Sequence, residues 1–356
     1  MAGFKIDISI ELIQHYYNSY KYNHPDTLCL NDDITKFDLN EFKTSFIKNE
    51  EIDGIIGGPP CVGFSTVGDR KPTDPRNMLI YFFIQWVNYF KPKFFVMENV
   101  PGILSMAKGK IVEKIIELYK DIGYTCKKEI LLAAEYGVPQ LRKRVFFIGT
   151  LDDAILSLKL NKTNREHDGQ KTLFEQELLP TFLTVKDAFS DVINIPPFTE
   201  NIYDDLSIQY TIPPETEYQK YLRKNSEQIF EHFAPNHSKE VIERISQLRQ
   251  GDNHASLPSK YKLKGGYPNI YGRLNLKKPA DTITGNCGCV SAPGRFIHPT
   301  QQRAISVREA ARLQSFPDNY RFFGNMMERY RQVGNAVPPL MAFEVAKAIK
   351  KIMNII

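Results

Sequence analysis

The 356-residue sequence contains few cysteines, and they do not form a paired pattern. The five cysteines are an odd number and lie scattered at Cys29, Cys61, Cys126, Cys287 and Cys289. This arrangement argues against a disulfide framework and favours a reduced protein of the cytosol. Cys287 and Cys289 have no second pair at the spacing of zinc ligands, so no metal site is expected.

Long apolar runs are also missing. The most apolar window, residues 79–90, is interrupted by Gln85 and Asn88 and is too short to cross a bilayer. The first residues carry no apolar signal region, and the chain shows no internal repeat, so no membrane partner is expected. The formal net charge of +5 permits a nucleic-acid partner without requiring one.

Apolar runs typical of strands alternate with helical stretches in the first half of the chain. The clearest helix covers residues 111–122, because four apolar side chains share one face and Gly123 follows. Such alternation predicts an α/β fold, with a doubly wound, mostly parallel sheet covered by helices on both faces. The expected strands are residues 6–10, 27–30, 52–56, 94–97 and 145–148.

The alternation stops near Leu151, where polar and turn-forming residues become frequent. This change predicts a second, smaller and loop-rich domain. Regular signals return at Ser306 and Glu309, which form a capping box at the start of a short helix that Phe316-Pro317 closes. The last expected helix covers residues 340–356, with an apolar stripe made of Phe343, Ala346, Ile349 and Met353.

Chemically useful side chains follow four of the expected strands. They are Glu11, Asp33, Cys61, and Glu98 with Asn99. If these strands are parallel, all five side chains face one crevice at the carboxyl edge of the sheet. Any one of them alone is better explained as a solvated loop residue, but four strands that end this way favour a site.

Gln140, Arg142 and Arg144 come before their strand rather than after it. In an antiparallel strand they would reach the same crevice, with both arginines on one side because side chains alternate. A solvated basic turn is the alternative. Arginines beside Cys61 would stabilise its thiolate, and a carboxyl group opposite could protonate a ring nitrogen. This set suits covalent activation of a pyrimidine at C6.

Five segments, in the same order, resemble the motifs of bacterial DNA cytosine-5 methyltransferases of the restriction–modification type. The resemblance covers almost the whole chain. The segments are Pro59-Pro60-Cys61-Val62-Gly63-Phe64-Ser65, Glu98-Asn99-Val100, Gln140-x-Arg142-x-Arg144, the run from Arg308 to Asp318, and Gly334-Asn335-Ala336-Val337-Pro338-Pro339.

The resemblance implies a role for each matching residue. Cys61 attacks C6 of a cytosine flipped out of double-stranded DNA, and Glu98 interacts with N3 of that base. Arg144, together with Arg142, holds the O2 and phosphate edge of the nucleotide. The methyl donor is S-adenosyl-L-methionine. The expected cofactor contacts are Glu11 at the ribose, Asp33 and Ile34 at the adenine, Pro59, and Asn335 with Val337 as a closing lid.

The same resemblance implies three regions. Residues 1–184 form the first part of the catalytic domain, residues 185–325 the target-recognition domain, and residues 326–356 return to the catalytic domain. The family's N-terminal Phe-x-Gly-x-Gly loop has no counterpart in this sequence. We expect a fragment, a misplaced start codon or a split enzyme with a complementary N-terminal polypeptide; otherwise we expect a monomer.

Two other functions stay open at this point. A transfer-RNA cytosine methyltransferase of the same fold would share the nucleophile loop, but the long segment 151–306 favours DNA. A DNA-binding remnant that does not modify its site is the other alternative.

Overall fold

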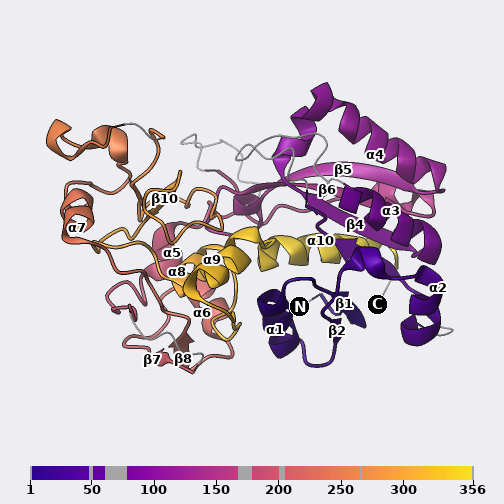
Figure 1. Ribbon diagram of the computed structural model, residues 1–356, viewed down its shortest axis with the longest axis horizontal. Helices are drawn as coiled ribbons and strands as arrows, with labels where there is room; N and C mark the ends of the chain where they lie inside the picture. Colours follow the sequence, from indigo (N-terminus) through magenta and orange to yellow (C-terminus); the bar gives the residue numbers. More distant parts are fainter. Residues whose placement is uncertain are drawn as a thin grey trace.

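The computed structural model describes residues 2–47, 51–60, 78–166, 179–199, 205–264 and 267–354 (Figure 1). Strands β1 to β6 gather in one half of the molecule, and the short elements from α5 to β10 gather in the other. The C-terminal helix α10, Pro339–Ile352, lies with the first half although it comes last in the chain.

The main sheet has four strands in the order β3-β4-β6-β5. Their bounds are β3 Gly54–Gly57, β4 Phe94–Asn99, β5 Thr125–Leu132 and β6 Lys143–Thr150. β3 and β4 are parallel, whereas β6 runs antiparallel to both β4 and β5. A separate parallel pair consists of β1 (Ile8–Ile10) and β2 (Leu28–Leu30).

The prediction of an α/β fold with these strands is confirmed, and the sheet is mixed rather than mostly parallel. All five expected strands are present with shifted ends. β5 was not expected, because its sequence TCKKEILL has charged residues at its centre and reads as part of a surface segment. Among the described residues β5 pairs with β6 alone, and an edge strand of this kind tolerates charged residues on its solvent side.

Side chains of β4 alternate between two apolar clusters, so the sheet is covered on both faces. Phe95 and Met97 pack with helices α3 (Met78–Phe90) and α4 (Lys110–Asp121). Phe94 and Val96 pack on the opposite side with α10. The predicted helix at 111–122 is thus confirmed as α4, and Gly123 after it has a φ of +88°, a conformation that favours glycine.

The predicted apolar stripe of the last helix is wrong in detail. The buried face of α10 consists of Met341, Val345, Ala348 and Ile349, and the helix ends at Ile352. Phe343 and Ala346 of the predicted stripe are only half-buried. The prediction began the apolar face at Phe343, whereas the buried face begins at Met341, in the first turn of the helix.

The other half of the molecule consists of short elements joined by long connections. The capping box at the start of α8 is confirmed: Ser306 Oγ accepts from the Glu309 backbone N–H, and Glu309 accepts from the Ser306 N–H. The elements are α5 Val185–Phe189, β7 Ser207–Gln209, α6 Glu217–Arg223, β8 Gln228–Phe230, α7 Lys239–Ser246, β9 Gly272–Arg273, β10 Arg295–Ile297, α8 Val307–Leu313 and α9 Met326–Asn335.

Near β1 and β3, the first half is completed by α1 (Gln14–Asn23) and the single-turn helix α2 (Leu39–Phe42). None of the helices in the described ranges is long and apolar enough to cross a membrane. Among those same residues, no group of histidine, cysteine and carboxylate side chains could hold a metal ion.

Candidate active site and cofactor cleft

Glu98 and Arg144 meet where the end of β4 lies beside the start of β6. The antiparallel register pairs Glu98 with Phe146 and Asn99 with Val145. Arg144, just before them on β6, thereby reaches Glu98, and its Nε lies 2.8 Å from Glu98 Oε1. Only 11% of the Arg144 side chain and 16% of the Glu98 side chain are exposed, so the ion pair is largely shielded from water.

Burial controls the protonation of this pair. Desolvation raises the pKa of Glu98, and the positive charges of Arg144 and Arg142 oppose that rise. Desolvation also lowers the pKa of Arg144, against the attraction of Glu98. Glu98 therefore keeps a proton to a higher pH than an exposed glutamate does, which suits a group that must act as an acid.

The chain leaving β3 is held against the end of β4. Asn99 Nδ2 donates a hydrogen bond of 3.1 Å to the Pro59 carbonyl oxygen. A side chain at Gly58 would place its Cβ 3.1 Å from Glu98 Oε2, so the backbone approaches the carboxylate closely there. Cys61 follows Pro59 by two residues and lies outside the described residues.

Arg142 occupies a different position from Arg144. Its side chain is completely buried. Its NH1 donates to the Ile283 carbonyl oxygen at 2.8 Å, and its NH2 donates to the carbonyl oxygens of Gly334 and Ala336, each at 2.9 Å. Both terminal nitrogens are thus engaged by backbone, whereas Arg144 is engaged by the carboxylate of Glu98.

Glu11 follows β1 and is fixed by its own loop. Its Oε1 accepts from the Ile13 N–H at 2.8 Å, and burial raises its pKa. Asn31, at the end of β2, donates to the carbonyl oxygens of Glu11 and Leu12 at 2.7 and 3.1 Å. Leu12, directly after Glu11, is 62% exposed, so an apolar side chain lies in solvent beside a carboxylate.

Asp33 follows β2 and caps one helical turn that begins at Ile34. Its Oδ1 accepts from the Thr35 N–H at 2.9 Å and from Thr35 Oγ1 at 2.8 Å. These hydrogen bonds to the ionised form lower the pKa of Asp33. Asp33 and Glu11 therefore present two carboxyl groups at the ends of neighbouring parallel strands.

Asn335, the last residue of α9, lies against the first half of the molecule. Its Nδ2 lies 3.1 Å from the hydroxyl oxygen of Tyr16 in α1. Val337 packs on the apolar cluster that β4 forms with α10. The structure thus places Asn335 beside the helix that follows Glu11, although 324 residues separate the two in the sequence.

These side chains form a set suited to the nucleoside end of S-adenosylmethionine. Carboxylates accept from ribose hydroxyls and from an exocyclic amino group, and an exposed leucine can cover a base. The sequence interpretation missed Leu12, Asn31 and Tyr16. An apolar residue directly after Glu11, in a turn, was the one signal that could have indicated Leu12.

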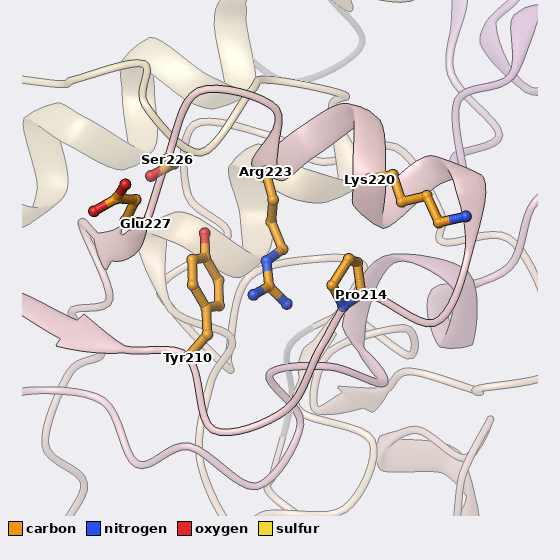
Figure 2. Close-up of a pocket in the computed structure, with 6 residues that line it drawn as sticks. All are labelled: Tyr210, Pro214, Lys220, Arg223, Ser226 and Glu227. Carbon is orange, nitrogen blue, oxygen red and sulfur yellow. The ribbon is translucent and has the colours of Figure 1, made fainter.

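A cavity away from this site lies beside α6 (Figure 2). It has a volume of about 510 Å³, and Tyr210 and Arg223 line it. The Arg223 guanidinium lies 3.6 Å from the Tyr210 ring centre and donates to the Asp191 carboxylate at 3.2 Å. Figure 2 shows Lys220 pointing away from this pair. The cavity shares no residue with the Glu98 site, so we assign it no part in the reaction.

Comparisons with known proteins give the family of the chain. The family model "C-5 cytosine-specific DNA methylase" matches residues 1–351. The type II methyltransferase M.DdeI of Desulfomicrobium norvegicum is 35% identical, over 98% of this chain and 84% of that protein. The type II methyltransferase M1.HphI of Haemophilus parahaemolyticus is 33% identical, over 98% of this chain and 82% of that protein.

Solved structures give the same result. A protein described as a DNA modification methyltransferase encoded within an E. coli prophage has a TM-score of 0.77 at 29% identity, covering 99% of this chain and 94% of that one. A Spodoptera frugiperda DNMT2 structure has a TM-score of 0.56 at 16% identity, covering 98% and 92%, which supports the fold alone.

The fold is that of a methyltransferase of the α/β class. The chain belongs to the C-5 cytosine-specific DNA methylase family. It is a DNA cytosine-5 methyltransferase that uses S-adenosylmethionine. The alternatives of a transfer-RNA enzyme and of a remnant without activity are not favoured.

Proposed function

We propose that this chain methylates C5 of a cytosine flipped out of double-stranded DNA, with Cys61 as the nucleophile. The observation that supports this assignment is the buried pair of Glu98 and Arg144, 2.8 Å apart, beside the backbone of Gly58, which precedes Cys61 by three residues. A shielded acid, a neighbouring guanidinium and a thiol form the set that covalent activation of a pyrimidine needs.

In this mechanism the Cys61 sulfur bonds to C6 while Glu98 delivers its proton to N3 of the base. The C5–C6 π pair then forms a double bond between C4 and C5, while the C4–N3 π pair takes the proton on N3. The product is an enamine whose C5 is nucleophilic. Bound S-adenosylmethionine supplies the methyl group that C5 accepts. Water then accepts the C5 proton, and the electron pair of that C–H bond re-forms the C5–C6 double bond and expels the Cys61 sulfur as a thiolate. N3 returns its proton to Glu98, which restores the aromatic ring.

We propose that Arg144, and not Arg142, contacts the O2 and phosphate edge of the flipped nucleotide. Arg144 already faces Glu98 and so lies where the base must sit. Its positive charge also favours the Cys61 thiolate. Extruding the base costs a few kcal/mol, which contacts in this pocket offset.

For the cofactor we propose that Glu11 accepts from the ribose hydroxyls and that Asp33 and Ile34 hold the adenine. Leu12 covers one face of the base. Pro59 lies at the methyl-donor end of the cleft, beside Glu98. Asn335, supported by Tyr16, and Val337 close the cleft from the C-terminal side.

The finer assignments are proposals too. We propose that residues 185–325 recognise the target sequence, that residues 1–184 and 326–356 form the catalytic domain, and that methylation protects DNA in a restriction–modification system. We propose that the protein acts in the reducing cytosol, which the free cysteines among the described residues support. We also propose that it acts as a monomer unless a complementary polypeptide is present.

We also propose that one further strand completes the cofactor cleft, from a longer chain or a complementary N-terminal polypeptide. Among the described residues β1 pairs only with β2, and β3 pairs only with β4. An added strand would satisfy the free backbone groups of both edges. The 356-residue chain should then bind S-adenosylmethionine more weakly than an N-terminally extended form, and equal calorimetric affinities would contradict this.

The function is tested by identifying the methylated product. The chain is incubated with labelled S-adenosylmethionine and either duplex DNA or transfer RNA, and the nucleosides are separated by mass spectrometry. We expect label in 5-methyldeoxycytidine from the duplex. Label in RNA, or DNA binding without label, would replace the proposal by one of the two alternatives.

A further inference from the structure

We infer that Arg142 is a positioning residue that fixes Asn335 over the cofactor cleft, and that it does not contact the base. This inference rests on the proposed contact between Asn335 and the cofactor. It concerns what holds Asn335 in place, and the Glu98 chemistry does not enter it.

The guanidinium of Arg142 grips the backbone on both sides of Asn335. The carbonyl oxygens of Gly334 and Ala336 each accept from NH2 at 2.9 Å. Because the two acceptors flank Asn335 directly, they fix the direction in which its side chain leaves the backbone. These carbonyls lie at the C-terminal end of α9, where helices leave acceptors without partners and where a positive charge is favourable.

The same backbone is pinned from its other side. A Cβ at Gly334 would lie only 2.1 Å from the carbonyl carbon of Thr284, so the two backbones are in direct contact. Arg142 NH1 donates to the carbonyl oxygen of Ile283, the residue before Thr284. One guanidinium therefore hydrogen-bonds to two backbone segments that are in direct contact with each other.

Gln140 holds the backbone just before Arg142 in place. Its Nε2 donates to the Leu313 carbonyl oxygen and to Gln314 Oε1, each at 3.0 Å. Its Oε1 accepts from the Ile283 N–H at 2.9 Å. The segment that carries Arg142 is thus fixed to the end of α8 before it enters β6, so Arg142 cannot shift without breaking these bonds as well.

Arg142 and Arg144 have different roles because their side chains contact different parts of the molecule. Arg142 and Arg144 are two residues apart, so one segment carries the residue that faces Glu98 and the residue that holds Asn335. Asn335 in turn reaches Tyr16 on the helix that follows Glu11. Arg142 thereby links the placement of the base site to that of the cofactor cleft, through backbone contacts alone.

The test measures binding of S-adenosylhomocysteine by calorimetry, in Arg142→Lys, Asn335→Ala and the double variant. A lysine keeps the charge but loses the planar fork that reaches several carbonyls at once. We expect each single variant to weaken binding by about tenfold, within the range typical of coupled sites. We expect the double variant to bind no more weakly than Asn335→Ala, because Arg142 acts through Asn335.

Arg273→Lys is the matched control. Arg273 is also buried, and its NH1 and NH2 donate to backbone carbonyls at 2.7 to 2.9 Å, but none of these acceptors borders Asn335. We expect Arg273→Lys to lower the melting temperature as Arg142→Lys does and to leave S-adenosylhomocysteine affinity unchanged. Equal loss of affinity in both variants would overturn the inference and leave only a general stabilising role.

The remaining outcomes separate the inference from the proposed function. Unchanged affinity in Asn335→Ala would show that Asn335 does not contact the cofactor. Weak binding in Asn335→Ala with unchanged affinity in Arg142→Lys would overturn the positioning role itself, as would fully additive losses in the double variant. If Arg142→Lys does not fold, Gln140→Met replaces it; reduced affinity supports the inference and unchanged affinity overturns it.

Discussion

Arg144 Nε lies 2.8 Å from Glu98 Oε1, and both side chains are largely buried. The contact exists because β6 runs antiparallel to β4, which brings the start of one strand to the end of the other. Had β6 been parallel, Arg144 would lie at the opposite edge of the sheet. The direction of a single strand therefore creates a charged pair at the edge where ligands bind in such folds.

Replacing Glu98 should remove most of the activity while leaving DNA binding intact. In Glu98→Gln the amide is close to isosteric but cannot deliver a proton to N3, so we expect kcat to fall by about 10²- to 10⁴-fold. Single-turnover methylation and DNA binding are measured side by side. Glu129→Gln, on β5 and paired with Lys127 at 3.1 Å, is the matched control and should keep parental rates. Parental rates in Glu98→Gln would mean that another group is the acid.

Removing the charge of Arg144 should move the pH dependence of the reaction. Arg144 lowers the pKa of Glu98, against desolvation, so Arg144→Gln raises that pKa further. Since the reaction needs protonated Glu98, kcat/KM falls as the pH rises through this pKa. The alkaline limb should therefore shift to higher pH in Arg144→Gln, at a lower maximal rate. Arg144→Lys keeps the charge and should shift the limb less. A limb that stays or moves to lower pH in Arg144→Gln would contradict the assignment.

Stability should fall in mild acid because of a buried histidine. Burial lowers the pKa of His298 from 6.5 to about 4, and its Nδ1 accepts from the backbone N–H groups of Thr300 and Gln301. Between these pH values the unfolded chain binds the additional proton, so protonation favours unfolding. The contribution of neutral His298 to the free energy of unfolding is fully present above pH 6.5. About 3 kcal/mol of it should be lost as the pH falls to about 4.

Denaturant unfolding across this pH range checks the prediction. His298→Asn keeps an acceptor near the position of Nδ1 and should flatten the profile, since asparagine does not titrate. Burial lowers the pKa of His232 as well, so a remaining slope in His298→Asn is expected. An unaltered profile in His298→Asn would refute the assignment.

Features that depend on short-range sequence patterns could be predicted from the sequence. Residue spacing predicts the capping box at Ser306 and Glu309, the end of α4 at Gly123, and every strand of the first half except β5. The convergence of Glu98 and Arg144 could also be predicted, given the side-chain alternation of an antiparallel strand. These features involve residues that are adjacent in the chain or at facing ends of neighbouring strands.

The features that could not be predicted from the sequence depend on contacts with backbone groups far away in the chain. Arg142 matches a motif as well as Arg144 does, yet its three acceptors are carbonyl oxygens more than 140 residues away. Carbonyl groups are present at every position, so no residue type signals such a partner. The apolar stripe of α10 was misassigned for a similar reason, because several faces of that helix are apolar and only the sheet selects Met341 and Val345.

The most direct test of the whole account is a covalent trap. Duplex DNA with 5-fluorocytosine at the target keeps a fluorine at C5 that cannot leave as a proton does, so the bond between Cys61 and C6 persists. With S-adenosylmethionine present, we predict a complex that resists denaturant on an electrophoresis gel. Cys61→Ser should bind the same DNA and form no such complex, because a hydroxyl is a far weaker nucleophile than a thiolate. A denaturant-resistant complex in Cys61→Ser, or none in the parent despite methylation of normal DNA, would contradict the covalent mechanism.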